Sequence, residues 1–176
     1  MALNDRFTED EQFLLANAPY LVGTVMVFSE GSGIGTIKEM YSNSKSFIGG
    51  AKSFPSNEII SGILPNMTDF SDVREKSSAL KEKSMEAFKE KGIKSKEEMK
   101  AYALAELAKV TTLLKDKANK DELAEYNQWV LSIAENVAKA AKEGGFLGFG
   151  GELVSEGEKE FYAEVASVLE SDVQLG

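Results

Sequence analysis

The sequence contains no cysteine and no histidine. Without cysteine the chain forms no disulfide and offers no thiolate as a nucleophile or metal ligand. Without histidine it lacks the side chain that most often serves as a general base or a transition-metal ligand. Serine–histidine and cysteine–histidine catalysis and the usual structural zinc sites are therefore excluded. Any chemistry must come from carboxylates, lysines, hydroxyls and backbone amides.

Long apolar runs and a leader-like N-terminus are also missing. The longest apolar run, Tyr20 to Phe28, is much shorter than the ~20 residues that cross a bilayer. The opening MALNDRFTEDEQ carries acids where a signal peptide has a basic region and an apolar core. These features predict a cytoplasmic protein.

Basic residues are in deficit, with 20 lysines and arginines against 29 aspartates and glutamates, a net charge of −9. The acids gather at the two ends of the sequence: residues 1–30 hold five acids and one base, and residues 143–176 hold eight acids and one base. Such a chain repels a phosphate backbone, so we expect no nucleic-acid partner.

Apolar residues recur at helical spacings of three and four over most of the 176 residues, and few segments alternate as strands do. Three of the helical patterns begin with a capping-box signature, Thr8 with Glu11, Ser95 with Glu98 and Ser155 with Glu158. Pro19 is predicted to interrupt a helix or to begin a second one. The chain is predicted to be a single all-α domain over residues 1–176, a bundle of six to eight helices.

One predicted helix, residues 68–91, is densely charged and has only a thin apolar stripe that begins at Phe70 and includes Ser84. Such a helix is either a solvated outer helix or a docking surface. We favour the outer helix, at the periphery of the bundle.

A glycine-rich segment, Gly31 to Gly35, follows the apolar run and is similar to a dinucleotide-binding turn. The dinucleotide fingerprint needs a third glycine where Thr36 stands, and a phosphate loop needs a lysine where Ile37 stands. The rest of the chain offers no parallel strands for such a fold. We therefore read Pro19 to Phe28 as a buried helix that ends in a glycine-rich corner, and nucleotide binding is not expected there.

A second corner, EGGFLGFGGELVSEGEK, resembles the first in that an apolar helix leads into glycines and acids. Both corners resemble the TerB-like helical domains of tellurite resistance, in which an acidic glycine turn precedes V-S-x-x-E at the start of a helix. Val154 to Lys159, VSEGEK, matches the second element, and Phe28 to Gly31, FSEG, stands where the first turn would be. The first corner lacks a following V-S-x-x-E, and FLGFGGEL lengthens the second.

The resemblance implies an all-helical fold, links to stress response and membrane-associated complexes, and, in some members, divalent-cation binding by acids at these turns. It implies no known reaction. By position it nominates Glu30, Glu156 and Glu158 as metal ligands. The composition of the second corner adds Glu143 and Glu152, which flank its glycines. The ion would be calcium, magnesium or manganese, which take oxygen ligands; no haem, zinc or nucleotide is expected.

The same acids also suit the first turns of helices, where the helix dipole favours negative charge, and this simpler reading stays open. The second corner raises a further alternative through the apolar segment Phe146 to Phe149. Buried, these side chains plug the end of the bundle; exposed, they would meet a partner protein or touch a membrane peripherally.

Two functions remain from these patterns. The first is a non-enzymatic binding or scaffold module of TerB-like type that acts through a protein partner. The alternative is a carboxylate-based enzyme dependent on magnesium or manganese, which needs several acids converging in a pocket. Glu158 and Glu160 are two residues apart and face different sides of a helix, so we favour the non-enzymatic module.

Overall fold

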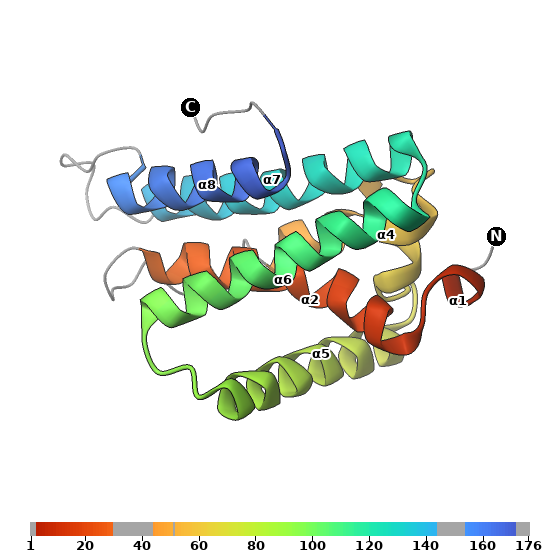
Figure 1. Ribbon diagram of the computed structural model, residues 1–176. Coiled ribbons are helices and arrows are strands. Elements are labelled where there is room, and N and C mark those ends of the chain that lie inside the picture. The colour runs from red at the N-terminus through yellow and green to blue at the C-terminus, as the bar shows by residue number, and fades with distance from the viewer. Residues whose placement is uncertain (1–2, 30–43, 51, 144–153, 172–176) are drawn as a thin grey trace.

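A computed structural model describes residues 3–29, 44–50, 52–143 and 154–171 (Figure 1). Its described elements are all helices, with no strand among them, and they confirm the predicted all-α bundle. The helices are α1 (Leu3–Arg6), α2 (Glu9–Ser29), α4 (Glu58–Ile63), α5 (Phe70–Lys91), α6 (Lys96–Lys117), α7 (Lys120–Glu143) and α8 (Glu156–Val168). A further helical stretch covers residues 44–50.

Helix α2 is the centre of the bundle and packs against α4, α5, α6, α7 and α8. By length and composition it is the one helix among the described residues that could cross a bilayer, but 56% of its most apolar window is buried by the other helices. Core helices of soluble proteins pass the same test, so this finding assigns no location.

The prediction that Pro19 breaks this helix is wrong, because α2 runs through it without interruption. Proline has no N–H to donate, so the carbonyl four residues earlier loses its usual helical partner. That carbonyl belongs to Leu15, and it accepts a hydrogen bond of 2.6 Å from the Tyr126 hydroxyl of α7. The tertiary bond from Tyr126 thus satisfies the group that Pro19 leaves open.

The helix termini follow the local signals in the sequence. The three predicted capping boxes form, with Thr8 and Glu11, Ser95 and Glu98, and Ser155 and Glu158 bonding each other's backbone N–H groups. Helix α5 ends at Gly92, whose φ of 67° is in the left-handed region that glycine adopts without strain.

At one end of the bundle, which we call the Glu122 end, polar side chains tie α1, α4, α6 and α7 together. Arg6 of α1 donates two hydrogen bonds to Glu122, at 2.7 and 2.8 Å, and a third to the Lys117 carbonyl at 2.9 Å. Asn57 caps α4 with its side-chain oxygen and donates its amide to the Glu122 carbonyl at 3.0 Å. The Glu122 side chain is 9% exposed, so this ion pair is largely shielded from water.

The aromatic core lies around Trp129 of α7, which is 1% exposed and packs against Phe47 and Tyr126. Gly50 makes room for this indole, because a methyl group at that position would lie 2.4 Å from the Trp129 ring nitrogen. Trp129 is therefore a core residue.

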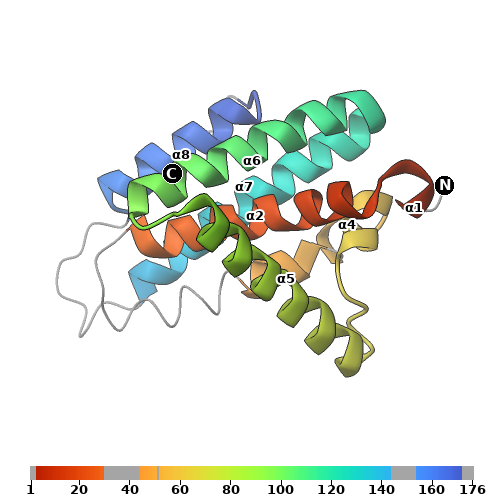
Figure 2. The ribbon, with the colours of Figure 1, turned by 60° about the horizontal axis from the view of Figure 1, so that its bottom comes forward.

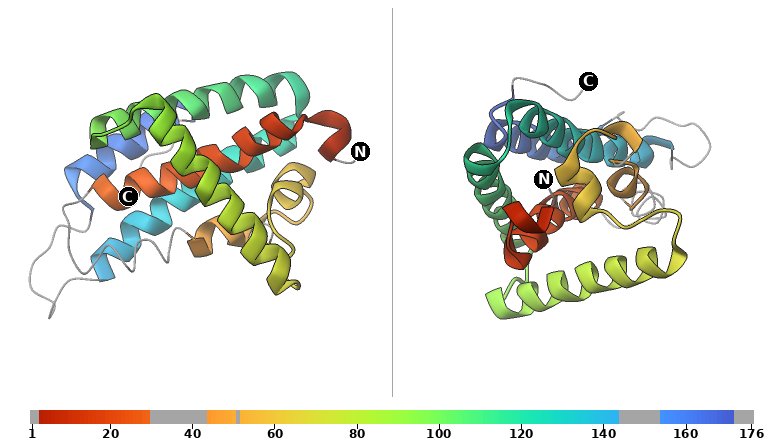
Figure 3. Two further views of the ribbon diagram at one scale, coloured as in Figure 1. Left: turned by 90° about the horizontal axis from the view of Figure 1, so that it is seen from below. Right: turned by 90° about the vertical axis from the view of Figure 1, so that its right-hand side faces the viewer.

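Helix α5 crosses the outside of the bundle, as Figures 2 and 3 show, and covers most of the predicted charged helix 68–91. Its one buried residue is Ser84, whose hydroxyl lies 2.6 Å from the side-chain oxygen of the buried Asn17 in α2. Phe70 was assigned to the inward stripe, and that assignment is wrong: its side chain is 91% exposed. It stands at the first residue of α5, beyond the region that touches α2.

Candidate functional site

The site is the opposite end of the bundle, which we call the Ser29 end. There α2 ends at Ser29, α6 begins at Lys96, α7 ends at Glu143 and α8 begins at Glu156 (Figure 1). The end of α2 touches the start of α8, because a methyl group at Gly157 would meet the Ser29 carbonyl oxygen at 3.5 Å. The helices that flank the two glycine-rich corners are therefore neighbours, although they lie far apart in the sequence.

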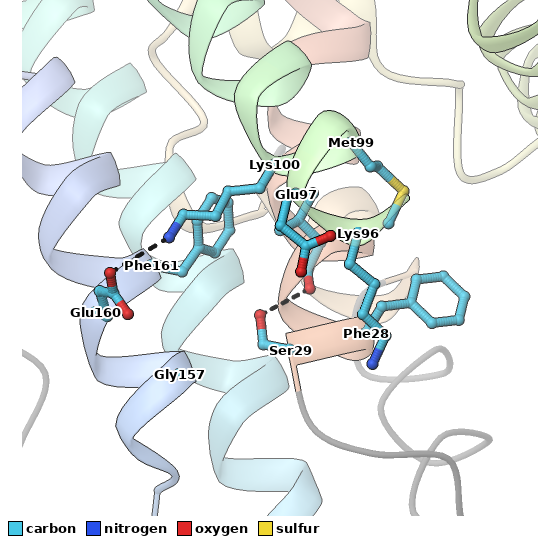
Figure 4. Close-up of a pocket in the computed structure, with 10 residues that line it drawn as sticks. Phe28, Ser29, Lys96, Glu97, Met99, Lys100, Gly157, Glu160 and Phe161 are labelled. Atoms are coloured by element: carbon cyan, nitrogen blue, oxygen red, sulfur yellow. Dashed lines mark hydrogen bonds and ion pairs between the residues drawn. The ribbon is translucent and has the colours of Figure 1, made fainter. Parts of the chain in front are cut away.

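A groove of about 300 Å³ opens between α2, α6 and α8 at this end (Figure 4). Its apolar walls include Val25 and Phe161, which are buried, and Phe28, which is 38% exposed at the rim. Lys96, Glu97, Lys100 and Glu160 add charges of both signs. An exposed aromatic ring beside alternating charges is a composition suited to a protein surface more than to a closed small-molecule cavity.

An ion-pair network joins α6 to α8 along one side of the groove. Lys100 lies 2.7 Å from a Glu164 carboxylate oxygen. It lies 3.7 Å from a carboxylate oxygen of Glu160, the pair drawn in Figure 4. The hydrogen bond to Glu164 and the charges of both carboxylates raise the pKa of Lys100 above its usual 10.5. The lysine side chain keeps 29% exposure and that of Glu160 71%, so water screens much of this attraction.

Two of the five predicted metal ligands are fully described, and both already have protein partners. Glu158 is 1% exposed, and one of its carboxylate oxygens accepts from the Ser155 N–H at 2.8 Å and from the Ser155 hydroxyl at 3.0 Å. Glu156 is 81% exposed in its side chain and pairs with Lys159 at 2.8 Å. These contacts are those of a capped helix start, the simpler of the two readings.

The other predicted features at this end fall on residues that the structure does not describe. Glu30, Glu152, Gly31 to Gly35 and Phe146 to Phe149 lie outside the described ranges, as does the side chain of Glu143. Among the described side chains, no three acids gather closely enough to hold a metal ion. What the structure adds is the proximity of the two helix ends, Ser29 and Gly157, that border the corners.

The groove residues on α6, namely Lys96, Glu97 and Lys100, were not among the predicted site residues. Their sequence context is an ordinary charged first turn after the Ser95 cap. Their position at the groove depends on how α6 packs against α8 and α2, which no local signal specifies. The capping boxes at Ser95 and Ser155 could have shown only that two helices begin in the same way.

No protein-family model, no curated protein and no solved structure matches this chain. The resemblance to TerB-like domains therefore stays a prediction that rests on its two short motifs.

Proposed function

We propose that this chain is a non-enzymatic helical binding module of TerB-like type, related to stress response in the cytoplasm. It engages a protein partner at the Ser29 end and binds a divalent cation at the acidic turns of that end. The observation that carries the proposal is the contact between the last residue of α2 and the start of α8, 3.5 Å from the Ser29 carbonyl oxygen to a methyl position at Gly157. The described helix ends that border the two acidic glycine-rich corners are thereby neighbours.

The number of acids in the two corners of the sequence supports the cation part of the proposal. Carboxylates brought together repel one another, and calcium, magnesium or manganese would relieve that repulsion. The ligands we propose are Glu30, Glu143, Glu152 and Glu156. Glu158 supports the cation site indirectly, because its buried carboxylate holds Ser155 at the start of α8.

The groove supports the partner part of the proposal. Phe28 offers an aromatic anchor at its rim, and buried aromatic anchors carry most of the binding energy in protein interfaces. A carboxylate enzyme would instead need acids converging on a substrate. Of the two groove acids, Glu160 faces Lys100 across the α6–α8 junction, an arrangement that favours binding over catalysis.

The cation is tested by calorimetric titration of calcium, magnesium and manganese into chelator-treated protein. We expect saturable heat that is lost in the double variant Glu30→Gln and Glu152→Gln and reduced in Glu156→Gln. Asp121→Asn, an exposed acid in the first turn of α7 at the other end, is the control and should bind as the wild type does. Absence of heat with all three ions would refute the cation part.

The partner is tested separately by affinity capture from the cells in which the protein occurs. A partner retained by the wild type should be lost with Phe28→Asp and kept with Met85→Asp, an apolar side chain that is 48% exposed on α5. If both variants lose the partner equally, or if neither loses it, the interface does not lie at the Ser29 end.

A further inference from the structure

A second groove, of about 420 Å³, lies on another face of the molecule, between α7 and the helical stretch 44–50. Its polar side chains are Lys45, Ser46, Ser53, Ser132, Asn136 and Lys139. None of its lining residues is acidic, in a chain whose net charge is −9. The lining of this groove therefore carries positive charge in a chain whose net charge is negative.

The donors of this groove are partly uncommitted. Lys45 makes no ion pair with any residue in the described ranges, and the same holds for hydrogen bonds from the hydroxyls of Ser46 and Ser53. Lys139 lines the groove and pairs with Glu135 one turn earlier on α7, so its charge is partly committed. The Ser132 hydroxyl is committed, because it donates to the Trp129 carbonyl at 2.7 Å.

The base of the groove restricts what can bind. Trp129 lines it but is 1% exposed, with its ring covered by Phe47 and Tyr126, so no base or aromatic ring can stack on the indole. Beside it Gly49 leaves open space, since a methyl group there would meet nothing within 4 Å. The volume is at the small end of ligand pockets and suits a compact polar group.

We propose that this groove binds a phosphate-sized oxyanion, either free phosphate or the phosphoryl group of a small molecule. Two lysines from facing elements supply the charge, and lysine is a regular phosphate ligand that acts as a point charge. The Ser46 and Ser53 hydroxyls supply neutral donors of the kind that orient the oxygens.

Trp129 provides the measurement, because it is the one tryptophan of the chain and lines the groove. Its fluorescence is followed while inorganic phosphate replaces chloride at constant ionic strength and pH 7. We expect a saturable change that weakens several-fold in Lys45→Gln and Lys139→Gln and is abolished in Gly49→Glu, which places a carboxylate in the open space. Glu135→Gln, which releases Lys139, should tighten binding.

The matched control is Lys120→Gln, which removes the same charge at the far end of α7. It should leave phosphate binding unchanged while Lys45→Gln weakens it; equal weakening would mean that net charge alone is responsible and would overturn the site. A lack of saturation up to about 10 mM phosphate would do the same. If glycerol phosphate binds more tightly than inorganic phosphate, the natural ligand is a phosphate ester; the opposite order identifies the free ion.

Discussion

At the Glu122 end of the bundle, the shielded bidentate ion pair of Arg6 with Glu122 and the buried Asn57 join four helices. At the Ser29 end, the partly exposed Lys100 bridges two helices beside an open groove. Charges held out of water cost much when one partner is removed, whereas exposed pairs contribute little. The comparison indicates that the Glu122 end contributes more to the stability of the fold than the Ser29 end does.

The largest expected effect comes from Glu122→Ala. This change leaves the Arg6 guanidinium largely buried without its carboxylate, so we expect the free energy of unfolding to fall by about 3 kcal/mol in chemical denaturation. A loss below about 1 kcal/mol would show that the Glu122 end does not secure the fold.

The pH dependence of stability checks the same ion pair. The hydrogen bond from Arg6 holds the pKa of Glu122 below its usual 4.5. A lowered folded-state pKa stabilises the protein above pH 4.5 and loses that contribution as pH falls through the folded value. The stability difference between wild type and Glu122→Gln should therefore be constant at neutral pH and shrink under acid conditions.

The next effect concerns the central helix where it passes Pro19. Tyr126→Phe removes the donor to the Leu15 carbonyl and should cost about 1–2 kcal/mol, because that carbonyl is then buried without a partner. In a Pro19→Ala background the restored N–H of residue 19 can serve the same carbonyl, so the cost of Tyr126→Phe should fall. Additive costs in this double-mutant cycle would contradict the account.

This is also the clearest case in which the sequence alone was insufficient. Pro19 reads as a helix break from its neighbours, and the hydroxyl that satisfies Leu15 comes from a residue 111 positions away. Signals contained within a few residues, such as the Ser95 and Ser155 caps, were predicted as they occur. The grooves could not be predicted, because the relative placement of helices sets them.

At the Ser29 end, Ser155→Ala removes the cap of α8 and should lower the free energy of unfolding by about 1 kcal/mol. Ser167→Ala, an exposed serine in the last turn of the same helix, is the control and should change stability little. Hydrogen exchange of the first turn of α8 should rise in Ser155→Ala alone. Equal effects of the two variants would mean that the capping box is not what holds this turn.

The smallest effect is expected from Lys100→Ala, at no more than about 0.5–1 kcal/mol, because its pairs are partly exposed. The raised pKa of Lys100 means that its contribution is complete below pH 10.5 and is lost as pH rises through the folded value. If Lys100→Ala lowers the free energy of unfolding as much as Glu122→Ala does in the same denaturation experiment, the two ends do not differ in their contribution to stability.

Helix α5 buries only Ser84 against α2 and leaves the packing of α2, α6, α7 and α8 to those helices themselves. Mutations along its outer face therefore meet almost no packing constraint. Over evolutionary time such a helix can change its length, charge and apolar residues while the core sequence stays fixed. It is the part of this molecule in which a lineage could acquire new surface chemistry at little risk to folding.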